Sequence, residues 1–147
     1  MLNYSCLYFN DLSLQQLYAL LTLRAEVFVV EQNCPYLDPD GQDTGALHVL
    51  GYEDAQLAAY ARVYVPEPGV AAIGRVAVGK EFRGRGYGRQ LMQAAMDAAA
   101  ASFNAAVIRI SAQRYLERFY ESMGFQITSA PYLEDNIPHI GMTRITG

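Results

Sequence analysis

The segment at residues 83–89, with the sequence RGRGYGR, alternates arginine with glycine. It lies between a run typical of a β-strand, at 71–78, and a run typical of a helix, at 87–101. The first turn of a helix presents unpaired N–H groups and a partial positive charge, and glycines let a ligand approach the backbone closely. The segment therefore predicts a site for an anion such as a pyrophosphate, bound mainly by backbone, because exposed arginines contribute only about 0–1 kcal/mol each.

Two common nucleotide-binding loops do not match this spacing. A Walker A loop requires Lys followed by Ser or Thr after its last glycine, where this chain has Arg89 and Gln90. The dinucleotide fingerprint requires GxGxxG, whereas Gly84, Gly86 and Gly88 follow the spacing GxGxG. The anion is therefore not expected to be bound by either of these folds.

The pattern Arg83-x-x-Gly86-x-Gly88 resembles the coenzyme A loop of the GNAT superfamily of N-acetyltransferases. The segment FYESMGF, at 119–125, resembles the aromatic-Tyr-x-x-x-Gly-Phe motif that follows this loop in the superfamily. Gln113 stands where many members have an asparagine that contacts the coenzyme. Longer stretches, LYALLTLRAEVFVVEQNCPYLDPDGQD, HVLGY and NIPHIGM, resemble the ElaA-like branch of the superfamily.

This resemblance implies an acetyl-CoA-dependent N-acetyltransferase, in which an amine attacks the thioester directly. It implies the α/β (α+β) class, with a mixed, mostly antiparallel sheet of six to seven strands flanked by helices. Tyr120 would be the general acid that protonates the departing thiolate of coenzyme A. The residues implied to bind the coenzyme are Val76, Ala77, Val78, Arg83, Gly84, Arg85, Gly86, Tyr87, Gly88, Arg89 and Gln113.

The general base that takes the proton of the ammonium group remains open at this point. His139, in the segment PHIGM, lies where the final strands of the superfamily line the acceptor cleft, and Glu31 follows a long predicted helix. The other candidates are Asp38, Asp40, Asp43 and His48.

The aspartate-rich run DPDGQD, at 38–43, predicts a solvated turn and, as a second reading, an acidic collar for a cationic acceptor. It does not match a calcium loop, because the position of the closing glutamate is occupied by Val49. We expect no metal site.

Hydrophobic periodicity predicts the elements that must position these residues. A helix from Leu14 to about Val30 begins with a capping box formed by Ser13 and Gln16, and a short helix at 114–123 ends before Gly124. A third helix is expected at 87–101 and loop at 31–46. Strands are expected at 4–9, 47–53, 56–65, 71–78, 105–112, 125–128 and 139–145.

The composition fits a single domain that spans residues 1–147. Of the eleven basic residues, five fall between Arg75 and Arg89, in a chain of net charge −4. Such a compact cluster favours a small anionic ligand over nucleic acid. We therefore expect a small-molecule or peptide amine as acceptor, no nucleic acid or membrane partner, and a monomer or homodimer.

The sequence also favours a cytoplasmic location. No apolar run approaches the roughly 18–20 residues of a membrane span, and the first residues lack the pattern of a secretory signal. Cys6 and Cys34 belong to no CxxC motif and have no histidine nearby at metal-ligand spacing, which predicts free thiols in a reducing compartment.

Two alternative functions are consistent with the same residues. One is a non-catalytic sensor that binds acyl-CoA on the same fold. The other is an acyl-homoserine-lactone synthase, whose N-terminal pattern the segment LRAEVFVVEQ resembles, although those enzymes are longer chains.

Overall fold

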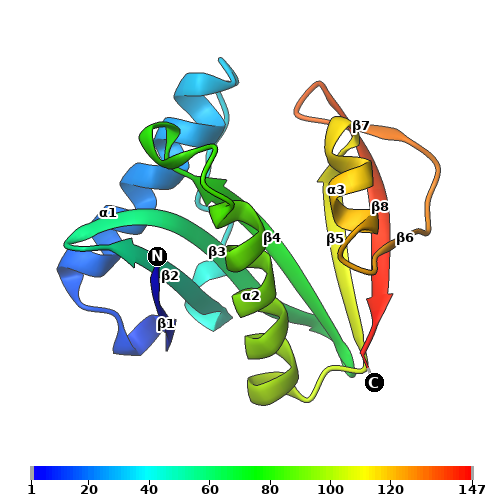
Figure 1. Cartoon of the computed structure of the whole chain (residues 1–147), viewed down its shortest axis with the longest axis horizontal. Helices are drawn as coiled ribbons and strands as arrows, with labels where there is room; N and C mark the ends of the chain where they lie inside the picture. Colours follow the sequence, from blue (N-terminus) through cyan, green and yellow to red (C-terminus); the bar gives the residue numbers. More distant parts are fainter. Residues whose placement is uncertain (1, 147) are drawn as a thin grey trace.

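The computed structural model describes residues 2–146. One mixed sheet runs through it in the strand order β1-β2-β3-β4-β5-β8-β6, and β7 also pairs with β8 (Figure 1). Among the strands of residues 2–146, only the β4–β5 pair is parallel. The strands are β1 Asn3–Tyr8, β2 Leu47–Glu53, β3 Gln56–Glu67, β4 Val70–Val78, β5 Val107–Gln113, β6 Gln126–Ile127, β7 Tyr132–Glu134 and β8 Ile137–Ile145.

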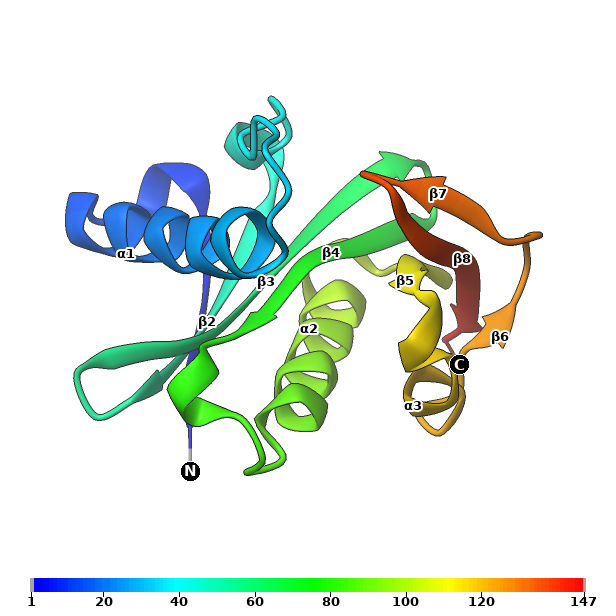
Figure 2. The same cartoon turned by 90° about the horizontal axis from the view of Figure 1, so that it is seen from above.

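Helices cover both faces of this sheet. Helix α1, Leu14–Arg24, lies on one face, whereas α2, Tyr87–Phe103, and α3, Glu117–Glu121, lie on the other (Figure 2). The apolar stripe of α2 is its buried face, because Leu91, Met92, Ala95 and Ala99 are fully buried against the sheet. None of the helices in the described part is long and apolar enough to span a bilayer.

The sheet opens between its two central strands. Strands β4 and β5 pair from Val70 with Val107 to Ile73 with Ile110, and no pair is formed beyond that point. Figure 1 shows the two strands together near the C-terminus and diverging toward the opposite edge. The second half of β4 therefore has a free edge that faces the gap.

Strand β4 contains a bulge at Arg75. Arg62 of β3 pairs with Gly74, but the next pair joins Tyr60 to Ala77, so two residues of β4 oppose one residue of β3. The backbone of Arg75 has a φ of 51°, in the left-handed region that favours glycine.

The bulge changes which side chains of β4 face each layer. Ile73 contacts the core beneath α2, and regular alternation would place residues 75 and 77 on that side. Instead, Val76 and Val78 pack there, while Ala77 packs beneath α1. Val76 and Val78 therefore share one face, as in a regular strand, but the inserted residue determines which face that is.

Three sequence predictions about the elements need correction. The predicted helix at 14–30 is α-helical only to Arg24, and a wider π-helical segment, Ala25–Glu31, follows. Strand β3 continues to Glu67 rather than ending at residue 65. The sheet has eight strands in the described part instead of six or seven, because β7 was not predicted.

Candidate active site

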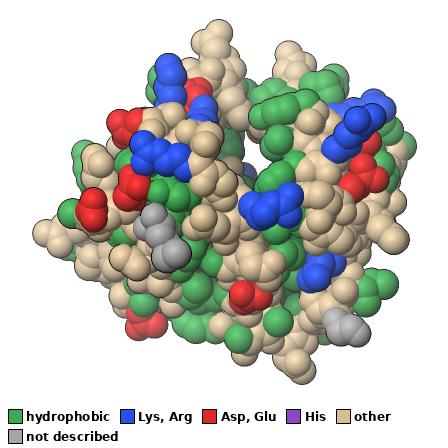
Figure 3. Space-filling model, viewed as in Figure 1, with side chains coloured by type: hydrophobic (Ala, Val, Ile, Leu, Met, Phe, Trp, Pro, Cys, Tyr) green, Lys and Arg blue, Asp and Glu red, His purple; other side chains and the backbone are tan. Residues whose placement is uncertain are grey.

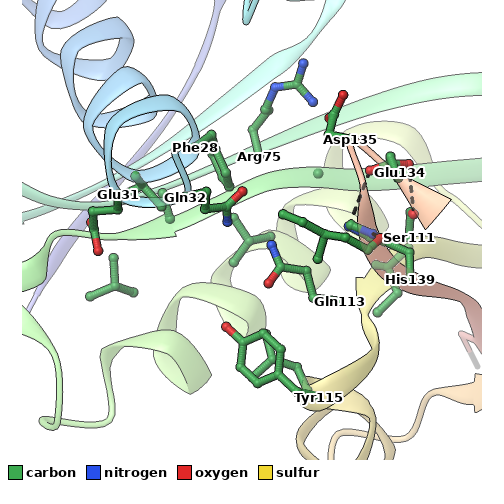
Figure 4. A pocket seen from close by; sticks show the side chains of 18 of the residues that line it. Phe28, Glu31, Gln32, Arg75, Ser111, Gln113, Tyr115, Glu134, Asp135 and His139 are labelled. Atoms are coloured by element: carbon green, nitrogen blue, oxygen red, sulfur yellow. Dashed lines mark hydrogen bonds and ion pairs between the residues drawn. The ribbon is translucent and has the colours of Figure 1, made fainter. Parts of the chain in front are cut away.

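A cavity of about 540 Å³ occupies the gap between β4 and β5. The space-filling view shows a hollow between the two halves of the molecule (Figure 3), and Figure 4 shows the side chains that point into it. Its walls come from the π-helical segment, the bulged half of β4, the end of β5, α3 and the β7–β8 hairpin. Residues far apart in the sequence therefore meet in one site.

The free edge of β4 presents backbone groups to this cavity. The N–H of Gly79 donates to the carbonyl of Ala58 on β3, at 2.8 Å. Because successive peptide groups of a strand point to opposite sides, the backbone groups of Val78 and Val76 face away from β3. The carbonyl of Val78 indeed accepts from Nε of Arg83 at 3.0 Å, which leaves Val76 to pair with a ligand.

The glycine-rich loop leaves open space at the start of α2. Gly84 and Gly86 have φ values of 80° and 78°, and a Cβ added to either would meet no atom within 4 Å. Gly86 is the N-cap of α2 and supplies no side chain to the N–H groups of the first turn. This cradle fits the pyrophosphate of coenzyme A, which needs close approach to free N–H groups.

The three arginines of the loop all have protein partners. Arg83 binds both carboxylate oxygens of Glu31, at 2.7 and 2.8 Å, and Arg85 binds Glu53 at 2.9 Å. Arg89 donates to a hydroxyl just after α3, at 2.7 Å. The hydrogen bonds from Arg83 lower the pKa of Glu31, which makes this carboxylate a weaker base. Tyr87 donates from its hydroxyl to Glu53.

Tyr120 projects from α3 into the cavity wall and is 7% exposed. Its ring packs edge-on against Phe119 and Phe125, with centroids 5.1 and 5.9 Å away. Burial, with a smaller contribution from Tyr115, raises the pKa of the Tyr120 hydroxyl to about 12. The hydroxyl makes no hydrogen bond within residues 2–146 and so remains available to a ligand.

His139, on β8, is held in one orientation by its neighbours. Its Nδ1 lies 2.7 Å from the carbonyl oxygen of Ile137, so Nδ1 carries the hydrogen of the neutral ring and Nε2 presents a lone pair. Tyr132 stacks on the ring, and a carboxylate oxygen of Glu134 lies 3.5 Å from Nε2. Ser111 donates to the other oxygen of Glu134, at 3.2 Å (Figure 4).

The cavity connects the two faces of the sheet. In β5 the side chain of Ile110 faces the core beneath α2, whereas Ser111 and Gln113 alternate with the buried residues. Gln113 pairs with His139 across β5 and β8, so these two side chains share the face opposite α3. Tyr120 approaches from the α3 side. A proton donor and a proton acceptor thus line one cavity from opposite faces.

The expectation of a solvated turn at 38–43 holds for residues 39–42, which are exposed, but is wrong for the two ends of the run. Asp38 and Asp43 are 7% and 9% exposed, and together with Asp40 they bind buried arginines. His48 is fully buried and bonds the hydroxyl of Tyr60 and the carbonyl of Asp43, at 2.6 and 2.9 Å. None of these four candidate bases lines the cavity, whereas Glu31 and His139 do.

Sequence reasoning missed several residues of the cavity wall. Ser111 alternates in phase with Gln113, a signal that marks a shared face. Glu134 precedes an Asp-Asn dipeptide whose residues both have positive φ, a typical sign of a tight hairpin. Other lining side chains that sequence reasoning did not assign to the site, and for which no local signal exists, include Val27, Phe28, Gln32, Tyr36 and Tyr115.

Comparison with known families agrees with this geometry. A family model described as an acetyltransferase (GNAT) domain matches residues 15–146. The chain belongs to this family. The match and the fold confirm the resemblance read from the loop at 83–89 and from the motif at 119–125.

Individual relatives place the chain in the ElaA-like branch. ElaA of Escherichia coli is 44% identical over 148 residues, which cover 98% of this chain and 97% of that protein. The crystal structure of ElaA has a TM-score of 0.92 at 42% identity, covering 98% of this chain and 99% of that one. An acyl-CoA N-acyltransferase from Pseudomonas aeruginosa has a TM-score of 0.93 at 44% identity, with the same coverage.

A more distant structure shares the fold alone. It is a GNAT family acetyltransferase from Elizabethkingia anophelis with acetyl-CoA bound, with a TM-score of 0.68 at 15% identity, covering 99% of this chain and 98% of that one. The mixed sheet, open between its central strands and flanked by helices, is therefore the GNAT fold.

Proposed function

We propose that this GNAT protein transfers the acetyl group of acetyl-CoA to an amine. The observation that supports this most strongly is the cavity that crosses the sheet, with Tyr120 on one face and His139 on the other. A donor that enters from the loop side and an acceptor that enters from the opposite face would meet in the gap between β4 and β5. Direct attack then needs no covalent intermediate on the protein.

Acetyl-CoA supplies the activated acyl group, and this chain offers two regions to bind it. The free edge of β4 would pair with the amides of pantetheine, and an N–H near Val76 would donate to the thioester oxygen. The loop would hold the pyrophosphate through the N–H groups that follow Gly86. The coenzyme-binding set is Val76, Ala77, Val78, Arg83, Gly84, Arg85, Gly86, Tyr87, Gly88, Arg89 and Gln113.

Tyr120 would act as the general acid. As the C–S bond breaks, its hydroxyl gives a proton to the thiolate, whose ordinary pKa of about 8.5 is itself raised in a buried site. Burial keeps the phenol protonated across the physiological range, because its pKa is about 12. The free hydroxyl on the cavity wall supports this role.

His139 would act as the general base in preference to Glu31. An alkylammonium, with a pKa of about 10.4, must lose a proton before its nitrogen forms the C–N bond. Nε2 of His139 presents a lone pair to the cavity, and Glu134 lies ready to stabilise the charged ring. Glu31 is instead held by two hydrogen bonds from Arg83.

The charges of the cavity favour a cationic acceptor, either a small-molecule or a peptide amine. Among the described residues, Glu134 and Asp135 pair with no lysine or arginine. The two arginines of the lining, Arg75 and Arg83, are both engaged by carboxylates. The charge left available to a ligand on the β7–β8 hairpin is therefore negative.

Thiol release from acetyl-CoA, measured against a panel of primary amines, tests the proposal. We expect at least one amine to stimulate release, and Tyr120→Phe to lower kcat by about 10²–10⁴-fold, the usual contribution of general acid–base catalysis. Coenzyme A affinity, measured by calorimetry, should be unchanged, because phenylalanine fills the same space.

Two results would decide against the proposal. Coenzyme A binding without turnover of any amine, and with Tyr120→Phe behaving as the parent, would indicate an acyl-CoA sensor. Failure of the parent to bind coenzyme A would remove the proposed donor altogether.

A further inference from the structure

Three arginines and three aspartates form a closed ring next to the active-site cavity. Each arginine bonds two aspartates and each aspartate bonds two arginines, in the order Arg24, Asp38, Arg75, Asp40, Arg62, Asp43 and back to Arg24. The six links measure 2.8, 3.0, 3.4, 2.7, 3.1 and 2.7 Å. The charges of the ring sum to zero.

The ring joins four parts of the chain. Arg24 is the last residue of α1 and is fully buried, Arg62 belongs to β3, and Arg75 belongs to the bulge of β4. The aspartates come from the loop at 38–43. Each guanidinium also lies over a tyrosine ring, at 5.5 to 5.8 Å, so the arginines are fixed on two sides.

Arg75 is the member of the ring whose backbone is strained. Its φ of 51° is unfavourable for any residue with a Cβ, and an unsupported arginine would leave this region. Its Nε donates to Asp38 and one Nη donates to the carbonyl of Asp38, both at 3.0 Å. Its guanidinium lies over Tyr36, which also lines the cavity.

The bulge at Arg75 lies where the site needs it. Pairing between β4 and β5 ends at Ile73, and the coenzyme-binding edge begins at Val76. The inserted residue separates these two regions and turns Val76 and Val78 toward the layer of α2. The position of the backbone donors in the cavity therefore depends on the conformation of a single residue.

We propose that Arg75 is a positioning residue, and that its bonds to Asp38 and Asp40 hold its backbone in the left-handed conformation that aligns β4 with the thioester. This inference rests on the proposed function, because it concerns the same coenzyme edge. The side chain of Arg75 acts through the backbone of Val76 and does not contact the reacting atoms.

The test replaces Arg75 with residues that differ in their tolerance of positive φ. Arg75→Gly, Arg75→Asn and Arg75→Ala all remove the same charge and the same ring bonds. Glycine adopts the left-handed region freely, asparagine adopts it more readily than most residues, and alanine resists it. Asp43→Asn breaks the ring between Arg24 and Arg62 without touching Arg75 and serves as the control for lost stability.

We expect kcat to be highest in Arg75→Gly, intermediate in Arg75→Asn and lowest in Arg75→Ala. Arg75→Ala should lose about 10²-fold in kcat, the usual cost of one misplaced oxyanion donor, and Arg75→Gly should remain within about tenfold of the parent, because glycine adopts this φ without strain. Amide hydrogen exchange at Ala77 and Gly79, whose register with β3 reports the bulge, should accelerate in Arg75→Ala and stay slow in Asp43→Asn.

Equal losses of kcat in Arg75→Gly and Arg75→Ala would overturn the proposal, because a backbone role predicts a difference. If Arg75→Ala does not fold, Arg75→Asn takes its place: a kcat below that of Arg75→Gly supports the proposal, and equal values of kcat in these two variants refute it. If the parent itself neither binds coenzyme A nor acetylates an amine, the proposed function fails, which is a separate result.

Discussion

At the scale of single residues, the two candidates for the general base, the carboxylate of Glu31 and the imidazole of His139, differ in their hydrogen-bond partners. Glu31 and His139 both line the cavity, but only Glu31 is bound by an arginine. A carboxylate that accepts two hydrogen bonds from a guanidinium loses basicity, whereas an imidazole whose Nδ1–H is fixed by a carbonyl keeps a lone pair on Nε2. This difference in basicity predicts that substitution of His139, rather than of Glu31, removes the general base.

We predict that His139→Gln lowers kcat by about 10²-fold or more, as expected for loss of a general base. Glu31→Gln, which preserves size and removes the ion pair with Arg83, should change kcat by less than about tenfold. Steady-state rates of thiol release with a saturating amine measure both variants. A larger loss of kcat in Glu31→Gln than in His139→Gln would assign the base to Glu31.

The residues of the loop and of the last helix could be predicted from sequence because their signals are local. Gly86 and Tyr120 each stand in a short motif with fixed spacing. The surroundings of His139 could not be predicted, since Glu134 and Tyr132 belong to a strand of three residues that shows no alternation. Contacts made across strands depend on register, which the spacing within one segment does not fix.

At the scale of elements, the loop before α2 has the backbone geometry of an anion site. Gly86 caps a helix of 17 residues with a φ of 78° and faces open space. Gly69, in the turn between β3 and β4, has nearly the same φ of 80° and also faces open space. The two glycines therefore form a matched pair, of which only one adjoins the proposed pyrophosphate.

We predict that Gly86→Ala weakens coenzyme A binding by about tenfold, or about 1.4 kcal/mol, because its Cβ enters the space of the pyrophosphate. Gly69→Ala should leave the affinity unchanged. Both variants should lose similar stability, about 1–2 kcal/mol for an alanine in the left-handed region. Calorimetric titration and thermal unfolding measure the two effects, and equal affinities of the two variants would argue against a pyrophosphate at this loop.

Elements with regular periodicity were predicted well, and their irregular parts were not. The stripe of α2 and the capping box of α1 follow from spacing alone, and both are present. The π-helical segment after Arg24 keeps apolar residues in helical spacing, so its wider turns leave no signal in the sequence. The bulge at Arg75 likewise leaves no signal in the sequence, because arginine is not a residue that the left-handed region favours.

At the scale of the whole molecule, we expect the ring of arginines and aspartates to contribute to stability as well as to the geometry of the site. The ring links α1, β3 and β4, and the sequence separations of its partners reach 37 residues, between Asp38 and Arg75. No local pattern in the sequence shows which arginine pairs with which aspartate, so the run at 38–43 on its own predicts a solvated turn. His48 lies beside the ring and bonds the carbonyl of Asp43.

Acidification should therefore lower the free energy of unfolding in two separate pH ranges. Burial, reinforced by the charges of Arg24 and Arg62, lowers the pKa of His48 below its ordinary 6.5. The unfolded chain then binds a proton that the folded chain excludes, so stability falls as the pH drops below about 6.5. For Asp40, partial burial opposes ionisation, but the hydrogen bond and charge of Arg62 outweigh it and lower the pKa to about 2. Its contribution is complete above about pH 4 and is lost between pH 4 and 2.

Urea unfolding at a series of pH values between 7 and 2 measures the decline in both ranges. His48→Gln should flatten the decline below pH 6.5, since the titrating group is gone, and should leave the decline between pH 4 and 2 in place. Asp40→Asn should flatten the decline between pH 4 and 2 and leave the decline below pH 6.5 in place. Its stability at pH 7 should be lower than that of the parent, because Arg62 and Arg75 lose a charged partner. A parent whose free energy of unfolding stays constant from pH 6.5 to 4 would contradict a buried, neutral His48. An unchanged slope between pH 4 and 2 in Asp40→Asn would show that Asp40 does not contribute to acid stability.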